Sequence, residues 1–193
     1  APVFDAYIDR LLRDWTGGTL NAAWDTGNGA AGPVVEALTK RIGGRQVVIN
    51  AEVDGTFPNH EANPLKHENL IDAENAVKEH GCDLGVAFDG DADRAILIDE
   101  KGHFISADKI TGLLAPRFLR DEPGAAIVYD LRSSWATREA IEEAGGKPIR
   151  ERVGHSFIKA TMREHGSPFG GELAGHFYFR RNYTADSSIM ILI

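Results

Sequence analysis

Hydrophobic positions along the chain alternate between helical and strand spacing. Near the start, apolar residues recur at intervals of three and four, which predicts an amphipathic helix over residues 3–15. Short apolar runs of strand length follow at 20–24, 46–50 and 84–88. The helical patterns between these runs lie at 34–42 and 68–79. This order of elements is typical of an α/β protein.

The second half of the chain repeats the alternation. We expect a hairpin with strands at 95–99 and 103–105, then a helix at 110–118 that bends or stops at Pro116. The further elements are a strand at 125–129, a helix at 135–144, a strand at 147–149, a helix at 157–164, a strand at 177–179 and a final helix capped by Asp186. The pattern therefore predicts two consecutive three-layer α/β/α units with mixed sheets, over residues 1–104 and 105–193.

Composition narrows the class of protein. The chain of 193 residues is long enough for two small domains, each with its own core. Its net charge of -8 argues against a general nucleic-acid surface, and no apolar run reaches the length of a membrane span. The one cysteine, Cys82, excludes an internal disulfide and is typical of a reducing compartment. We therefore expect a cytoplasmic protein that binds neither nucleic acid nor membranes.

Three aspartates alternate in a short loop directly after the apolar run at 84–88. The segment reads Asp89-Gly90-Asp91-Ala92-Asp93-Arg94. Mg²⁺ prefers oxygen ligands and is typically held by a few carboxylates together with substrate phosphate. In a loop kept open by Gly90, the three carboxylates can converge on one ion, and Arg94 would be free to face a phosphate. A solvated acidic turn is the plain alternative.

Two other kinds of site have to be considered for the same acidic loop, an EF-hand calcium site and a phosphatase active site. Counted as an EF-hand from Asp89, it has carboxylates at the first, third, fifth and twelfth positions, but Arg94 stands where that loop needs glycine. The flanks also have strand patterns, whereas an EF-hand needs helices. A magnesium-dependent phosphatase that forms an aspartyl-phosphate is the better rival, because Asp89 and Asp91 follow an apolar strand.

A glycine-rich turn after the first strand raises a third hypothesis. Residues 27–32 fit G-x-G-x-x-G, open a helix, and precede Glu52 by about 20 residues. These features are those of a dinucleotide-binding Rossmann dehydrogenase. A tight strand-to-helix turn would use the same glycines.

A second glycine-rich loop, over residues 170–176, places one glutamate and one histidine among small residues. Glycine lets a backbone approach a ligand closely. The carboxylate of Glu172 and the imidazole of His176 supply the acceptor and donor that adjacent sugar hydroxyls require. An ordinary glycine turn is the alternative.

Taken together, five segments give the chain a resemblance to the α-D-phosphohexomutase superfamily, most closely to its phosphomannomutase/phosphoglucomutase group. They are DTGNGAAG (25–32), DGTFPNH (54–60), DGDADR (89–94), GHSFIK (154–159) and GELAGH (171–176). Their order and spacing match the second and third of the family's four domains over essentially the whole chain. The resemblance makes the Rossmann and phosphatase hypotheses minor ones.

The resemblance implies a fold, a reaction and a set of site residues. Members transfer a phosphoryl group between the C1 and C6 oxygens of a hexose such as mannose or glucose, through a phosphoserine and a bisphosphorylated sugar. The implied Mg²⁺ ligands are Asp89, Asp91 and Asp93. The implied catalytic residues are Arg94, Arg132 and His155, and the implied substrate-binding residues are Glu172, His176 and Lys159.

Three departures from the family pattern limit what carries over. Relatives often have lysine at the position of Arg132, and many have serine at the position of Ala174. The Ser-His-Asn-Pro segment that carries the catalytic serine is absent. We therefore expect an inactive two-domain fragment, truncated at its C-terminus, whose partners are a hexose phosphate and the missing domains 1 and 4. A phosphoglucosamine mutase and a non-catalytic sugar-phosphate binding module remain alternatives.

Overall fold

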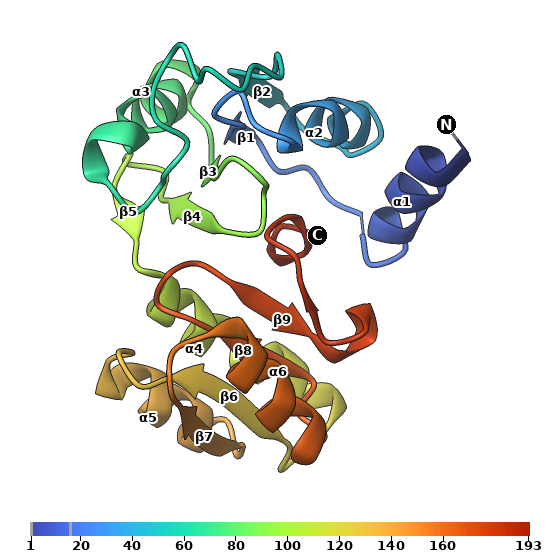
Figure 1. Ribbon diagram of the computed structural model, residues 1–193, viewed down its shortest axis with the longest axis vertical. Helices are drawn as coiled ribbons and strands as arrows, with labels where there is room; N and C mark the ends of the chain where they lie inside the picture. Colours follow the sequence, from blue (N-terminus) through green and yellow to red (C-terminus); the bar gives the residue numbers. More distant parts are fainter. Residues whose placement is uncertain (1, 16) are drawn as a thin grey trace. The chain divides into compact units, whose positions relative to one another are not determined.

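The computed structural model describes residues 2–15 and 17–193, which form two compact units (Figure 1). The first unit consists of the residues up to Ile105 together with the C-terminal segment Ser188–Ile193. The second unit is Ser106–Ser187. Each unit has its own mixed five-stranded sheet with flanking helices. The expected α/β fold class is confirmed. Within the described ranges, no helix combines the length and apolar character needed to span a membrane.

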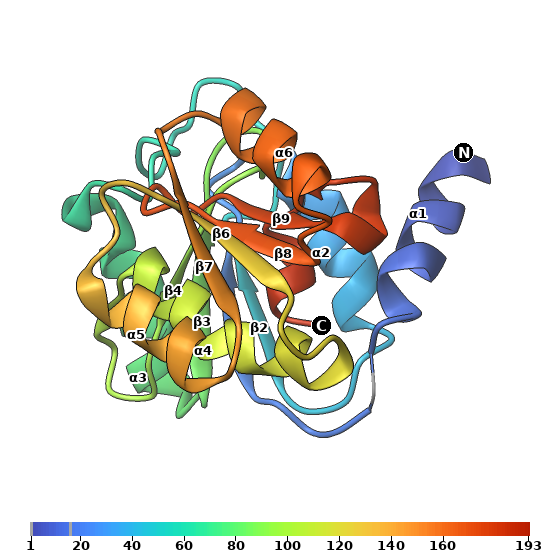
Figure 2. The same cartoon turned by 90° about the horizontal axis from the view of Figure 1, so that it is seen from below.

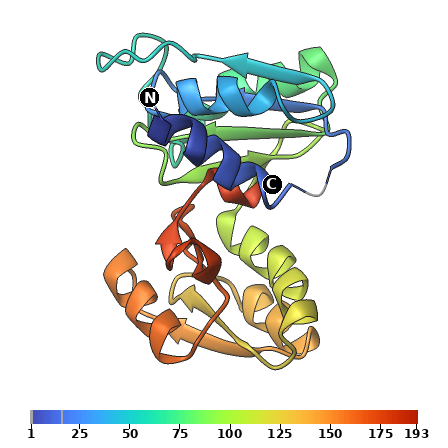
Figure 3. The same cartoon turned by 90° about the vertical axis from the view of Figure 1, so that its right-hand side faces the viewer.

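The first unit is built on three parallel strands and an antiparallel pair. Its elements are α1 (Pro2–Leu12), β1 (Ala22–Asp25), α2 (Ala31–Thr39), β2 (Gln46–Ile49), a 3₁₀ turn (His67–Leu70), α3 (Ile71–His80), β3 (Leu84–Phe88), β4 (Ala95–Ile98) and β5 (Phe104–Ile105). The strand order is β2-β1-β3-β4-β5, with β1 parallel to β2 and β3. Every residue of β1 is buried, as expected for a strand covered on both faces. Figure 3 shows α1 and α2 on one face of this sheet.

The second unit repeats this topology. Its elements are α4 (Ala107–Asp121), β6 (Ala126–Asp130), α5 (Trp135–Glu143), β7 (Lys147–Glu151), α6 (His155–Glu164), β8 (Phe169–Gly171), β9 (Phe177–Phe179), a 3₁₀ turn (Arg180–Asn182) and β10 (Ala185–Asp186). The strand order is β10-β9-β8-β6-β7, with β6 parallel to β7 and β8. In both units the carboxyl ends of three parallel strands therefore meet at one sheet edge, where α/β proteins place ligands.

Two adjacent glycines in β8 show that helices cover both faces of the second sheet. A Cβ on Gly170 would lie 2.9 Å from the Met162 sulfur of α6, whereas one on Gly171 would collide with Thr111 of α4. Neighbouring strand residues point to opposite faces, so α6 and α4 form two outer layers (Figure 2). The sequence pattern missed β8, because its Gly-Gly pair was assigned to the glycine-rich loop.

Tertiary packing overrides the expected break at Pro116. Helix α4 runs on to Asp121, although proline removes one helical hydrogen bond. Beyond Pro116, the ring of Phe118 stacks on Phe169 at 4.6 Å between centroids, and Leu119 is buried. These core contacts hold the last turn in helical conformation.

The expected final helix is wrong. Asp186 lies in β10, paired with Tyr178 of β9, and caps no helix. Only one 3₁₀ turn, Ile189–Ile191, follows it. The apolar end of the chain is also less exposed than expected, because Ile189 and Met190 are buried.

A long polar loop over residues 51–66 is held against the sheet edge of the first unit. Asp25, the fully buried last residue of β1, accepts hydrogen bonds from Asn50 Nδ2 at 2.9 Å and from the Gly27 amide at 3.0 Å. His60 Nε2 of the loop lies 2.9 Å from the second Asp25 oxygen. One buried carboxylate therefore anchors the turn after β1, the end of β2 and the long loop.

The packing around α2 predicts an effect of adding one methyl group at Gly32. A Cβ there would collide with the backbone oxygen of Ala51. Alanine favours helix over glycine by about 0.8–1.0 kcal/mol, but overpacking typically costs about 1–3 kcal/mol. We expect Gly32→Ala to lower the free energy of unfolding by about 1–2 kcal/mol, measured by urea unfolding. Gly55→Ala, with no neighbour within 4 Å of its Cβ, is the control. Equal losses would contradict the packing explanation.

The Asp25–His60 pair predicts pH-dependent stability. Hydrogen bonding to Asp25 outweighs burial and raises the pKa of His60 to about 9. Unfolded histidine titrates near pH ~6.5, so the stabilisation is complete below that pH and is lost as pH rises through about 9. We expect His60→Gln to cost on the order of 1–3 kcal/mol near pH 6 and much less near pH 10. Urea midpoints at both pH values measure this. The exposed His103→Gln serves as control, and a pH-independent loss would refute the linkage.

Candidate functional site

The acidic loop follows β3 at the carboxyl edge of the first sheet. Asp89, Asp91 and Asp93 each offer an oxygen, and these ligand atoms lie within 4.8 Å of one another. Asp89 is buried, Asp91 is exposed and Asp93 is intermediate. The alternating spacing therefore brings three carboxylates together in one loop, with one anchored in the protein and one open to solvent.

Arg94 does not lie free beside these carboxylates, in contrast to the expectation. Its Nε donates to Asp89 Oδ2 at 2.5 Å, its backbone amide donates to Asp89 Oδ1 at 3.2 Å, and its Nε lies 3.8 Å from Asp93. The turn between them passes through Ala92 at φ +64°, a left-handed conformation that non-glycine residues rarely adopt. A cation bound to Asp89 would compete with Arg94 for this carboxylate.

The glycine-rich turn supports the acidic loop. A Cβ on Gly29 would lie 2.7 Å from the Gly90 oxygen, and the Ala30 amide donates to that oxygen at 2.9 Å. The glycine at position 29 is therefore needed for close contact between two protein loops, which explains this part of the pattern without a dinucleotide. The strands β3 and β4 that flank the acidic loop also rule out an EF-hand.

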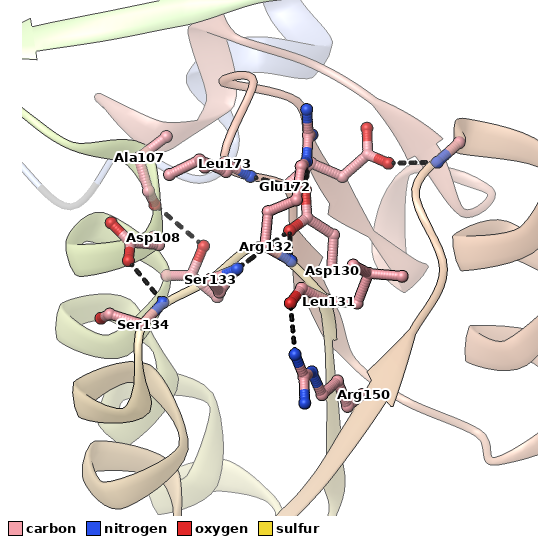
Figure 4. A network of polar contacts seen from close by, with 12 residues as sticks. Ala107, Asp108, Asp130, Leu131, Arg132, Ser133, Ser134, Arg150, Glu172 and Leu173 are labelled. Atoms are coloured by element: carbon pink, nitrogen blue, oxygen red, sulfur yellow. Dashed lines mark hydrogen bonds and ion pairs between the residues drawn. The ribbon is translucent and has the colours of Figure 1, made fainter.

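In the second unit, Asp130 organises the loops at the carboxyl edge of the sheet (Figure 4). This fully buried carboxylate ends β6 and accepts hydrogen bonds from the Arg132 amide at 2.8 Å and Arg132 Nη2 at 2.7 Å. It also accepts the amides of Ser133 at 3.1 Å and Leu173 at 3.0 Å. Asp130 thus joins the loop after β6 to the loop of residues 172–176, and it orients the Arg132 side chain.

Glu172 makes a second bridge between loops. Its Oε1 accepts the Gly154 amide at 2.8 Å, and its Oε2 accepts the Tyr178 hydroxyl at 3.0 Å. The side chain is almost fully buried. Its oxygens are therefore engaged by the protein, and the expected contact with sugar hydroxyls stays a prediction.

His155 and Gly154 form the start of α6. Gly154 has φ +128°, which only glycine adopts readily, and His155 is the exposed first residue of the helix. The hydrogen bond that the Gly154 amide donates to Glu172 therefore fixes where α6 begins. This places His155 at the carboxyl end of β7, next in space to the bridge made by Glu172.

Lys159 and His176 both contact Asp186, which was not among the site residues expected from the sequence. Lys159 Nζ donates to Asp186 Oδ1 at 2.9 Å, and His176 Nδ1 lies 3.4 Å from Asp186 Oδ2. Burial alone would raise the pKa of Asp186, but its bonds to His176 and Lys159 hold that pKa well below its usual range. Nothing in the local spacing marks Asp186, because its role depends on the pairing of β10 with β9.

Tyr178 packs against the same cluster. Its ring is stacked with His176 at 6.2 Å between centroids, and Lys159 Nζ lies 5.5 Å from its centre. The edge of the second sheet thus combines Arg132, Lys159, His155 and His176 with carboxylates that protein donors already engage. Such an arrangement suits an anionic ligand that also carries hydroxyl groups.

Comparisons with known proteins agree with this geometry. Residues 5–102 match the phosphoglucomutase/phosphomannomutase α/β/α domain II, and residues 106–193 match domain III. A phosphomannomutase of Salmonella typhimurium (strain LT2) is 44% identical over 194 residues, which cover 96% of this chain and 42% of the relative.

Solved structures show the same fold. A phosphoglucomutase/phosphomannomutase family protein from Burkholderia thailandensis has a TM-score of 0.94 at 37% identity, over 98% of this chain and 42% of that one. An N-acetylphosphoglucosamine mutase from Aspergillus fumigatus, solved with GlcNAc-6P and magnesium, has a TM-score of 0.66 at 17% identity, over 97% of this chain and 47% of that one. The chain spans less than half the length of these relatives. It belongs to the phosphoglucomutase/phosphomannomutase family, of which it carries α/β/α domains II and III.

Proposed function

We propose that this chain supplies the metal-binding and sugar-recognition domains of a phosphohexomutase that interconverts hexose 1-phosphate and hexose 6-phosphate. The observation that carries the proposal is the three-carboxylate loop with its paired Arg94, in a chain of this family. The reaction would proceed through a phosphoserine and a bisphosphorylated sugar. The runner-up is a sugar-phosphate binding module without turnover.

The donor set of the acidic loop fits Mg²⁺. The three ligands are carboxylates, which this hard cation prefers. The Arg94 amide holds Asp89 in place, and a cation bound to Asp89 would displace Arg94 Nε from it. Bound there, Mg²⁺ would neutralise charge on the transferred phosphoryl group. Arg94 carries a permanent positive charge at the same loop, and we assign it the role of holding a phosphate oxygen during transfer.

The second unit would orient the sugar phosphate. Arg132 keeps its charge at all relevant pH values and cannot act as a general base, so we assign it phosphate binding. His155 and Lys159 would supply further donors, while Glu172 and His176 would position the loop that contacts the hydroxyls. Ala174 offers no hydroxyl to the ligand, which leaves mannose, glucose and glucosamine phosphates as candidate substrates.

The phosphorylated serine would come from another domain. The chain contains no Ser-His-Asn-Pro segment, and it spans 42% of its Salmonella relative. We therefore propose that domains I and IV of a parent chain complete the enzyme, and that these 193 residues bind substrate without turning it over.

The metal assignment predicts a local effect of Mg²⁺. Titration should shift the amide NMR resonances of residues 90–94, and Asp91→Asn should weaken binding about tenfold, or about 1.4 kcal/mol. Asp5→Asn on the exposed face of α1 is the charge-matched control. Equal Mg²⁺ affinity in the Asp91→Asn and Asp5→Asn variants, or resonance shifts spread over the acidic surface, would contradict the metal assignment.

The functional assignment is tested in a chimaera. This chain replaces the matching region of the Salmonella phosphomannomutase, and the product is assayed with Mg²⁺ and a hexose bisphosphate primer. We expect the chimaera to convert mannose 1-phosphate. The rate of conversion should fall at least tenfold in His176→Ala and stay unchanged in the exposed His165→Ala. A folded chimaera that binds hexose phosphate without turnover would favour the binding module instead.

Asp186 predicts a positioning effect in the same chimaera. Asp186→Asn removes the charge that holds Lys159 and His176, so we expect kcat/KM to fall about tenfold and the pH profile to shift. Asp186→Glu should restore part of the activity. Asp121→Asn breaks only the exposed pair with Arg117 and should behave as wild type. An unchanged pH profile in Asp186→Asn would reduce Asp186 to a purely structural residue.

A further inference from the structure

A polar cavity lies in the second unit, on the side of the sheet covered by α5. It is partly open, has a volume of about 30 Å³, and is lined by Tyr129, Ser133, Ser134, Trp135, Arg138 and Arg150. None of the residues assigned to substrate or metal lines it. Its volume exceeds what a single water needs, and it is too small for a whole nucleotide.

Tyr129 lines this cavity with a largely buried side chain whose hydroxyl opens onto it. The residue is 4% exposed, and no hydrogen bond to its hydroxyl is found among the described residues. Because the cavity is partly open, this hydroxyl can donate to a group that enters it. Burial raises the pKa of Tyr129, while the charges of Arg138 and Arg150 oppose that rise. The hydroxyl is therefore a neutral donor close to two guanidinium groups.

The two arginines are oriented by the protein and keep donors available. Arg150 Nη2 donates to the Leu131 carbonyl at 2.5 Å, as Figure 4 shows. Arg138 Nε donates to Glu142 at 2.9 Å, one turn further along α5. Each bond engages one nitrogen of a group with five N–H donors. The remaining N–H groups can bind an oxyanion in the cavity.

The N-terminus of α5 adds donors from the backbone. Ser134 is the N-cap, and no side chain caps the helix there. The Thr137 amide is bound to the Ser134 carbonyl, whereas the amides of Trp135 and Ala136 have no acceptor among the described residues. The positive end of the helix dipole favours an anion at this point.

Trp135 borders the cavity as an exposed indole. Its side chain is 67% exposed, and the Arg138 guanidinium lies 5.5 Å from its ring centre. The lining thus consists of hydroxyl, guanidinium and amide donors beside one aromatic face, and it contains no carboxylate.

We propose that this cavity binds a small tetrahedral oxyanion, either inorganic phosphate or the phosphate group of a monoester. The site is separate from the proposed substrate site and does not rest on the proposed function. A phosphate can accept hydrogen bonds from the guanidinium, hydroxyl and amide donors that remain available in the lining, including the Tyr129 hydroxyl.

The experiment titrates inorganic phosphate into the chain at constant ionic strength and follows the amide resonances of Trp135 and Ala136 and the fluorescence of Trp135. We expect saturable binding with Kd on the order of 1–10 mM. Arg138→Gln/Arg150→Gln should abolish it, and Tyr129→Phe should weaken it several-fold. The matched control is Arg117→Gln, an exposed arginine in α4 with one carboxylate partner.

A second titration distinguishes inorganic phosphate from a phosphate monoester as the ligand. Glucose 6-phosphate that shifts the Trp135 and Ala136 amides at lower concentration than phosphate would identify a monoester as the better ligand. Non-saturable shifts, equal shifts with chloride, or unchanged affinity in the double arginine variant would overturn the proposal. The single Arg138→Gln variant, whose arginine is exposed, keeps the test valid if the double variant fails to fold.

Discussion

A buried carboxylate at the end of the central parallel strand holds the loops of each unit in place. Asp25 ends β1 and Asp130 ends β6, both are fully buried, and each strand lies between two parallel neighbours. An unpaired buried charge is very costly, so each carboxylate requires several donors. The donors come from loops that follow neighbouring strands: Asn50 and His60 for Asp25, and Leu173 for Asp130. One electrostatic requirement thus fixes several loops at once.

The same requirement determines which side chains remain available to a ligand. In the second unit, Asp130 and Glu172 are engaged by protein donors, and Glu172 fixes the start of α6 through Gly154. In the first unit, Asp89 is fixed by Arg94, while Asp91 stays exposed to solvent. Preorganisation of this kind is what the proposed phosphoryl transfer would need, because its catalysis depends mostly on position and electrostatics.

The sequence predicts much of this architecture and little of the contact network. Alternating apolar runs locate β1, β3 and β6, and the spacing of Asp89, Asp91 and Asp93 predicts that three carboxylates converge in one loop, because local periodicity determines both. The continuation of α4 through Pro116 depends on Phe118 packing against Phe169, which local propensity does not contain. The contacts of Asp186 and Tyr129 likewise cannot be predicted from the local sequence. The first gains its partners from the pairing of β10 with β9, and the second faces two arginines that come from α5 and β7.

The net charge of the chain does not describe the distribution of charge at the sheet edge of the second unit. A net charge of -8 would repel an anionic substrate if the charges were evenly spread. At the sheet edge of the second unit, however, Asp130 and Asp186 are buried or half-buried and bound to Arg132, Lys159 and His176. A paired carboxylate still orients its cation, and a phosphate can bind to the donors left over. The acidic residues at this edge therefore position the cations, and an acidic protein keeps a surface suited to an anionic ligand.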